Sequence, residues 1–338
     1  MTTVIWSNVS DPRQGGGLPY VLAIAAALSE VDRVRVRFPT ELSVDLARQL
    51  FPVPLDGLVL EADPRPSSLL REISDIAANP RQVIVQSTEV PRLRGLRRAH
   101  LVCEFPFQHR LGPGSRVRLA LFRSVVANSE YTARWIERRW GRKARVLHPP
   151  IFPVAPREKR PWIVAVGRFA GGGRSKRQVE MIEVFRTANL AGWELHLVGT
   201  AQDTEYVRRA QEAARGLPVV FHLDAPRTEL EEVCGSASLF WHFTGLGEDA
   251  PERMEHFGIA TAEAMSAGTV PVVLARGGQP EIVGEAGVLW ETTEECMEAT
   301  RRLCADDELR ARLGEASRQR AETFAFPRFA ERVREVFA

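Results

Sequence analysis

Two glutamates, Glu255 and Glu263, stand at the expected start of a short helix and could bind hydroxyl groups. The segment 255–268 is expected to form a loop followed by a helix with an alanine-rich face. The helix is expected to end at Gly268, a position where glycine in the left-handed conformation is common. The first turn of a helix has unpaired N–H groups and the positive end of the dipole, so it can bind phosphate. Those groups belong here to Phe257, Gly258 and Ile259. The two carboxylates could therefore hold a sugar and a ribose beside a phosphate, or they could simply favour a helix start and face water.

A second candidate for binding phosphate is the glycine-rich basic loop 167–176. It has the sequence GRFAGGGRSK and lies between the expected strand Trp162–Val166 and the expected helix Arg177–Thr187. It is not a Walker A loop, because Gly173 stands where that motif requires a lysine. The alternative to a phosphate site is a basic loop that faces solvent.

The basic residues of this loop suggest how a leaving group could be stabilised. Breaking a sugar–diphosphate bond places negative charge on the leaving oxygen, and two fixed cations with a helix N-terminus can offset that charge. Arg168 and Lys176 are the candidates, and Arg174 could share the work of Lys176. The chain has no Asp-x-Asp motif to hold a metal ion. We therefore expect no metal and no cofactor.

The segment 255–273, EHFGIATAEAMSAGTVPVV, resembles the Glu-x7-Glu motif of the retaining glycosyltransferases of family 4, and GGQPEIV at 277–283 continues the likeness. The resemblance extends more weakly over nearly the whole chain. It implies that Glu255 contacts the donor sugar, that Glu263 contacts the ribose, and that Arg168 and Lys176 face the diphosphate. It also implies that the base lies near Gly199 and Leu223 and is bound largely through the backbone.

The same resemblance extends to two points in the first half of the chain. Gln14 is followed by three glycines directly after the first expected strand, which by itself favours a tight turn. The glycine-rich loop of family 4 enzymes implies that Gly16 and Gly17 approach the donor. Many members carry a histidine after a later strand, where this chain has Glu104, with His109 further along. Which of these two residues acts on the acceptor stays open.

Alternating apolar runs and helical stretches predict an α/β fold with parallel sheets. With the resemblance, they indicate the GT-B fold, which has two doubly wound Rossmann-like domains with a cleft between them and a C-terminal crossover helix. We expect an acceptor-side domain at 1–155, a nucleotide-sugar domain at 156–322 and a crossover helix at 323–338. In the first domain, the expected strands are Val4–Asn8, Val34–Phe38, Val83–Ser87, Leu101–Phe105, Ser124–Asn128 and Arg145–His148, and the expected helices are Gly17–Leu28, Glu41–Leu50, Pro113–Phe122 and Tyr131–Trp140. The remaining expected strands are Trp162–Val166, Glu194–Val198, Val219–Leu223, Ser238–Phe243, Val270–Leu274 and Gly287–Trp290.

Composition narrows the class of protein and its partners. The net charge is only +2, but residues 92–145 contain fourteen lysines and arginines against three glutamates. This basic face could attract an anionic acceptor or weakly contact an acidic membrane, or it could be a solvated helical surface. No nucleic-acid motif accompanies the charge, so we expect no nucleic-acid partner. The four cysteines have no zinc or Cys-x-x-Cys spacing, no apolar run approaches the length of a membrane span, and the N-terminus has no signal layout, so we expect a cytoplasmic protein.

Together these features predict a retaining glycosyltransferase that moves a sugar from a UDP- or GDP-sugar to an unidentified acceptor without a metal ion. Two alternatives remain open. One is a disaccharide-phosphate synthase or a phosphorylase-like enzyme with the same fold. The other is a GT-B protein that binds a ligand or serves as a scaffold without catalysis.

Overall fold

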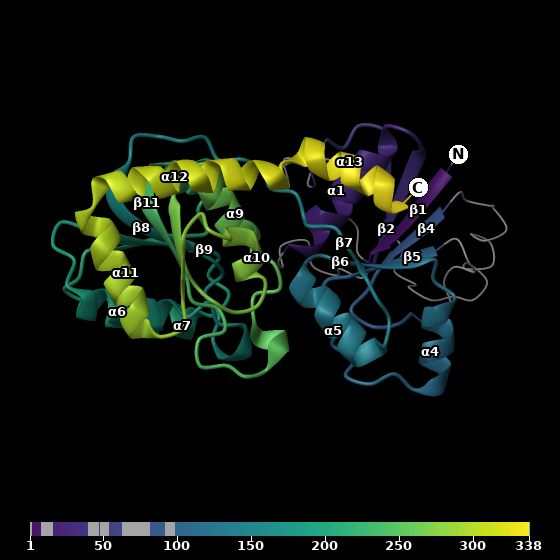
Figure 1. The fold of residues 1–338 in the computed structure, drawn as a ribbon, viewed down its shortest axis with the longest axis horizontal. Helices are drawn as coiled ribbons and strands as arrows, with labels where there is room; N and C mark the ends of the chain where they lie inside the picture. Colours follow the sequence, from purple (N-terminus) through teal and green to yellow (C-terminus); the bar gives the residue numbers. More distant parts are fainter. Residues whose placement is uncertain are drawn as a thin grey trace. The chain divides into compact units, whose positions relative to one another are not determined.

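The computed structural model describes residues 2–7, 16–39, 47, 54–62, 82–91 and 99–337. The chain divides into two compact units, of which unit 1 comprises 1–150 and 326–338 and unit 2 comprises 151–325 (Figure 1). The sequence analysis placed these boundaries at 155 and 322. The expected helix Glu41–Leu50 and the residues Gln14 and Gly15 lie outside the described residues, apart from Ala47.

Unit 1 is built on a parallel sheet with the strand order β3-β2-β1-β4-β5-β6-β7. Its strands are β1 (Thr2–Ser7), β2 (Arg33–Phe38), β3 (Leu58–Ala62), β4 (Gln82–Gln86), β5 (Ala99–Cys103), β6 (Ser124–Ala127) and β7 (Arg145–Val146). Among its described residues, the helices are α1 (Gly17–Ser29), α4 (Pro113–Ala120), α5 (Glu130–Trp140) and α13 (Phe326–Phe337). The edge strand β3 was not predicted, because its half-exposed sequence LVLEA lacks the apolar run of the inner strands.

Unit 2 has a second parallel sheet, with the order β10-β9-β8-β11-β12-β13. Its strands are β8 (Arg160–Val166), β9 (Glu194–Gly199), β10 (Val219–Leu223), β11 (Ala237–His242), β12 (Val270–Leu274) and β13 (Val288–Trp290). Its helices are α6 (Gln178–Ala188), α7 (Thr204–Ala213), α8 (Arg227–Ser236), α9 (Ile259–Ser266), α10 (Gln279–Val283), α11 (Thr293–Ala305) and α12 (Asp307–Ala321). The strand order reverses between β8 and β11, and ligands bind at the carboxyl ends of strands at such a switch point.

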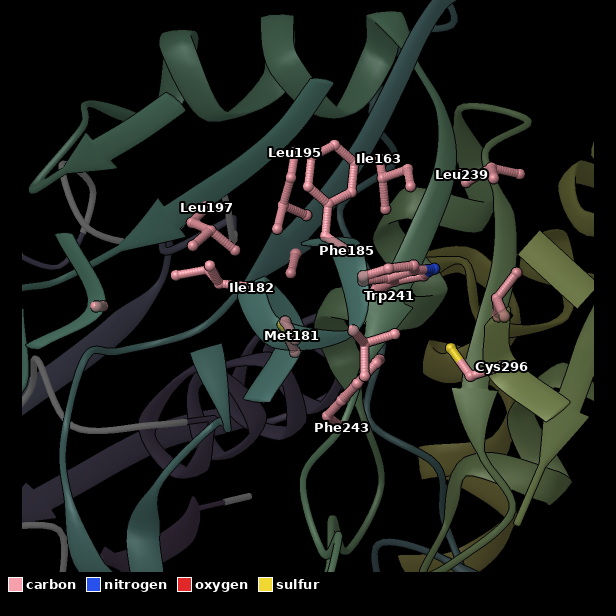
Figure 2. Close-up of a cluster of buried hydrophobic side chains, with 14 of the residues drawn as sticks. Ile163, Met181, Ile182, Phe185, Leu195, Leu197, Leu239, Trp241, Phe243 and Cys296 are labelled. Carbon is pink, nitrogen blue, oxygen red and sulfur yellow. The ribbon is translucent and has the colours of Figure 1, made fainter. Parts of the chain in front are cut away.

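Both faces of the unit 2 sheet are buried, which explains the continuous apolar runs in its strands. Side chains of α6, α7 and α11 pack on one face around Trp241. Figure 2 shows part of this cluster, including Phe185 of α6 and Cys296 of α11. Side chains of α8, α9, α10 and α12 pack on the other face around Phe240. Burying one such side chain contributes about 1.5–3 kcal/mol, so the two layers hold the carboxyl ends of the strands in fixed positions.

The terminal helix α13 belongs to unit 1 and packs on α1. The rings of Tyr20 and Phe329 lie 6.1 Å apart, and the Tyr20 hydroxyl donates to the Leu147 carbonyl at 2.6 Å. Arg145 donates to the carbonyl of Val336 near the end of α13, where a cation is favourable. In the part of the chain that the structure describes, no helix combines the length and apolar character needed to cross a membrane.

Candidate functional site

Lys176 and Glu255 form an ion pair at the carboxyl end of the unit 2 sheet. The Nζ atom of Lys176 lies 2.5 Å from Oε2 of Glu255, and each side chain is 21% exposed. Lys176 ends the loop that follows β8, whereas Glu255 lies in the segment between β11 and α9. Partial burial reduces the dielectric screening of the pair relative to a surface ion pair. The sheet therefore brings together two of the predicted site residues.

His242 is a third member of this cluster that sequence reasoning missed. It is the last residue of β11, and its Nε2 atom lies 3.0 Å from the same Glu255 oxygen and 3.2 Å from the Thr244 hydroxyl. Burial lowers the pKa of His242, so the ring is neutral near pH 7. The position of a polar residue at the carboxyl end of a buried strand was the signal that could have identified it.

The charge of Glu255 is stabilised by these two neighbours. Burial alone would raise its pKa, but Lys176 and His242 outweigh burial and hold the pKa well below its ordinary value of 4.5. Glu255 is therefore a carboxylate at any pH near neutrality. As a carboxylate it accepts hydrogen bonds only, which suits the hydroxyl groups of a sugar.

The backbone at Glu255 is held by the turn that starts α10. The N–H of Gly278 donates to the Glu255 carbonyl at 2.7 Å. Gly277 has φ +66°, and a Cβ atom there would lie 2.1 Å from the Glu255 carbonyl oxygen. Only glycine fits so close to another backbone. The glycine pair thus fixes the loop that carries Glu255.

The start of α9 differs in one respect from the prediction. The helix begins at Ile259 with Gly258 as its N-cap, so Phe257 precedes the first turn and does not belong to it. The Phe257 ring is instead buried against Phe324, with 5.6 Å between the centroids. The first turn therefore starts with the amides of Ile259 and Ala260, because Gly258 has a φ of +117°, which interrupts the helical backbone. At the other end, Gly268 has the expected left-handed φ of +74°.

Glu263 lies on α9 and pairs with a residue that was not predicted. The Nη1 atom of Arg227, at the start of α8, lies 3.1 Å and 3.3 Å from its two carboxylate oxygens. The Glu263 side chain is 12% exposed. Burial raises the pKa of Glu263, and the Arg227 charge opposes that rise. Nothing in the local sequence of Glu263 indicated this partner, because the two residues meet only through tertiary packing.

The ends of β8, β9 and β10 are joined by short polar contacts around the predicted residues Arg168, Gly199 and Leu223. The Nε2 atom of Gln178 donates to the carbonyls of Gly167 and Arg168, at 3.1 Å each. A Cβ atom on Gly199 would lie 2.0 Å from the Gly167 carbonyl, so glycine is required there. Leu223 ends β10, and the following N–H of Asp224 donates to Gly199. The backbone near the expected base site is therefore held by hydrogen bonds between the strand ends.

The loop 244–254 between β11 and α9 is held by Glu248. The Glu248 carboxylate pairs with Arg177 at the start of α6 and, at 2.8 Å, with Arg253. Arg276 donates to the Glu248 carbonyl at 2.7 Å. One glutamate thus ties the loop to α6 and to the turn before α10.

In unit 1, Glu104 lies at the carboxyl end of the sheet beside the start of α1. Gln86 donates both to its carboxylate and to the Gly17 carbonyl, and Ser7 donates to Gln86 at 2.6 Å. A Cβ atom on Gly17 would lie 2.6 Å from the carboxylate. Burial raises the pKa of Glu104, although the Gln86 hydrogen bond opposes the rise.

The other predicted residues of unit 1 lie at the surface. Gly16 is exposed and is the N-cap of α1, and His109 is exposed in the segment between β5 and α4. The roles assigned to Gly16 and Gly17 in donor binding, and to Glu104 or His109 on the acceptor side, stay predictions.

The two Rossmann-like units define the fold as GT-B, and the solved structures that resemble it are glycosyltransferases. A glycosyltransferase from Rickettsia africae has a TM-score of 0.76 at 13% identity, covering 99% of this chain and 97% of that chain. Anabaena HepE in complex with UDP and glucose has a TM-score of 0.73 at 16% identity, covering 99% and 98%. Identities this low establish the fold alone.

The sequence match supplies the family. The model of the family "Glycosyl transferases group 1" matches residues 151–320, half of the chain, and the chain belongs to this family. It is also 32% identical over 130 residues to sulfoquinovosyl transferase SQD2 of Arabidopsis thaliana. That match covers 36% of this chain and 24% of the plant protein, so the chain spans about a quarter of the curated relative it matches.

Proposed function

We propose that this glycosyltransferase is a retaining, metal-independent enzyme that takes its sugar from a UDP- or GDP-sugar. The observation that carries the proposal is the cluster of Lys176, Glu255 and His242 at the switch point of the unit 2 sheet. The cluster combines a cation with a carboxylate, which in this proposal bind the diphosphate and the sugar hydroxyls. The complexes of HepE with UDP and with UDP-glucose support a nucleotide-sugar donor.

In this proposal, Lys176 and Arg168 stabilise the charge that develops on the diphosphate. The bond between the anomeric carbon and the phosphate oxygen breaks, and the acceptor oxygen bonds to that carbon on the same face. The departing phosphate oxygen takes the acceptor proton, so the sugar keeps its configuration. Lysine and arginine supply the electrostatic stabilisation that a metal ion gives in other enzymes.

The remaining donor contacts follow from the same arrangement. Glu255 accepts from the sugar hydroxyls, and the amides at the start of α9 face the phosphates. Glu263 accepts from the ribose, and the base lies near Gly199 and Leu223. A base that is bound through backbone groups leaves uracil and guanine equally compatible with the side chains.

On the acceptor side, we propose that unit 1 favours an anionic acceptor or an acidic surface. A groove of about 450 Å³ between α4 and α5 is lined by four arginines. They are Arg116, Arg138, Arg139 and Arg142. The exposed apolar side chains Val117 and Leu121 lie on and just after α4. A basic groove beside apolar side chains suits a phosphorylated or lipid-linked acceptor.

Titration calorimetry with UDP-glucose and GDP-mannose, followed by assays of slow donor hydrolysis, tests the proposal. We expect one donor class to bind, and we expect the anomeric configuration of the released sugar, followed by NMR, to match that of the donor. An inverted product would overturn retention, and absence of binding to either donor would overturn the proposed donor class. Turnover only with sugar phosphates would indicate a disaccharide-phosphate synthase, and binding without turnover on a broad acceptor panel would indicate a scaffold.

A further inference from the structure

Arg227 connects three segments of unit 2 through its guanidinium group. Its Nη1 atom contacts both carboxylate oxygens of Glu263 on α9, at 3.1 Å and 3.3 Å. Its Nε atom donates to Glu231 on α8 at 2.8 Å, and Nη2 donates to the Phe152 carbonyl at 3.1 Å. Partners on three sides hold the planar group in one orientation. The direction of the Glu263 carboxylate is therefore set from α8.

The first turn of α8 is itself tied to the sheet by a chain of hydrogen bonds. Glu229 lies 2.7 Å from His222 of β10, His222 lies 3.0 Å from His196 of β9, and His196 lies 3.1 Å from Glu194. The turn that carries Arg227 is thus anchored to the strand that ends at Leu223.

We propose that Arg227 is a positioning residue for the donor: it orients Glu263 so that the carboxylate accepts from the vicinal ribose hydroxyls. This inference rests on the proposed function. Arg227 contacts both carboxylate oxygens, and the Phe152 backbone also donates to the carboxylate, so its orientation is fixed from two sides. The acceptor capacity that these contacts leave is directed toward the ribose. Arg227 itself does not contact the ribose in this arrangement.

The electrostatics of Glu263 support the same role. Its charged surroundings are Arg227 and Glu231 from α8, with the buried thiol of Cys234 further along that helix. Burial raises the pKa of Glu263, whereas the Arg227 charge and the Phe152 backbone lower it. Without Arg227, the pKa would rise further, and a protonated carboxyl would lose acceptor capacity. Arg227 therefore also keeps Glu263 in the form that binds hydroxyls.

The test measures UDP and 2′-deoxy-UDP binding by calorimetry between about pH 5.5 and 8. We expect Arg227→Gln to weaken UDP binding roughly tenfold near neutral pH, with a larger loss at lower pH, and to reduce the preference for UDP over 2′-deoxy-UDP. Arg208→Gln removes an exposed arginine of α7 and is the matched control, for which we expect wild-type affinity. A wild-type pH profile and ribose preference in Arg227→Gln would overturn the inference.

Two further comparisons separate this inference from folding defects and from the proposed function. If Arg227→Gln does not fold, Arg227→Lys keeps the charge but not the planar fork. We expect this variant to have the wild-type pH profile with a weaker preference for UDP over 2′-deoxy-UDP, and an unchanged preference would overturn the inference. If the wild-type protein binds neither UDP nor GDP, the proposed function fails, and the positioning role falls with it.

Discussion

Lys176 and Glu255 meet at 2.5 Å although 79 positions separate them in the chain. The lysine would face a diphosphate and the glutamate a sugar, so in the absence of a donor each residue stabilises the charge of the other. A bound diphosphate would compete with Glu255 for the lysine. The pair thus keeps both charges at the site before the substrate arrives.

The first prediction concerns this lysine. We expect Lys176→Ala to lower kcat by about 100-fold or more, because a removed charge-stabilising donor costs that much in comparable sites. Arg215→Ala, which removes an 81% exposed cation from unit 2, should leave kcat unchanged. Steady-state kinetics with the active donor measures both variants. Equal activity of the two variants would rule out a role for Lys176 in the leaving-group step.

A second prediction follows from the glycine that contacts Glu255. Gly277→Ala forces a Cβ atom to 2.1 Å from the Glu255 carbonyl. We expect either a decrease of more than about 3 kcal/mol in the free energy of unfolding or a displaced loop that no longer binds the donor. Gly216→Ala is the matched control, because Gly216 has a similar φ of +75° but open space around it. Its cost should be only about 1 kcal/mol. Urea unfolding and donor binding together distinguish the two effects, and similar values for both variants would contradict the close-approach argument.

A third prediction concerns the loop held by Glu248. Glu248→Gln removes the charge that pairs with Arg177 and Arg253, so the loop 244–254 should open more often. We expect faster limited proteolysis within this loop and a higher KM for the donor. Asp249→Asn changes a neighbouring exposed carboxylate and should behave like wild type. Identical proteolysis of both variants would show that the Glu248 pairs do not hold the loop.

The fourth prediction is a pH dependence of stability in unit 1. Burial, with Arg123 and Arg145 nearby, lowers the pKa of His100 to about 4. The unfolded chain therefore binds a proton between about pH 6.5 and 4 that the folded chain does not, and stability should fall as the pH is lowered through this range. The free energy of unfolding should decrease by about 3 kcal/mol when the pH falls through this range.

The control for this effect is His100→Gln, which cannot titrate in this range. Between about pH 7.5 and 4.5, the calorimetric transition temperature of unit 1 should decrease less in this variant than in the wild type. An equal decrease in both proteins would assign the acid sensitivity to other groups. His256 in unit 2, whose pKa burial also lowers to about 4, should affect the other transition.

A fifth prediction concerns metal removal. If Lys176 and Arg168 supply the stabilisation that a metal ion would otherwise give, EDTA treatment followed by assay in metal-free buffer should leave kcat unchanged. Loss of activity that added Mg²⁺ or Mn²⁺ restores would contradict this part of the proposed mechanism.

Much of the fold could be predicted from local patterns. Buried parallel strands such as Val270–Leu274 are continuous apolar runs, and Gly268 terminates α9 in the left-handed conformation. These features depend on neighbours within a few positions, so periodicity and glycine placement reveal them. The start of α9 was misplaced because Gly258 adopts a left-handed φ of +117°, and Phe257 before it packs on Phe324, a residue far away in the chain.

The sequence by itself determined the α/β class and the residues that carry charge at the expected loops, including Glu255, Glu263 and Lys176. Only the tertiary structure decided which groups these residues meet. His242 reaches Glu255 because β11 lies at the switch point of the sheet, and Arg227 reaches Glu263 because α8 and α9 pack on the same face. Strand order and helix packing depend on residues that are far apart in the chain, so a local motif does not determine them.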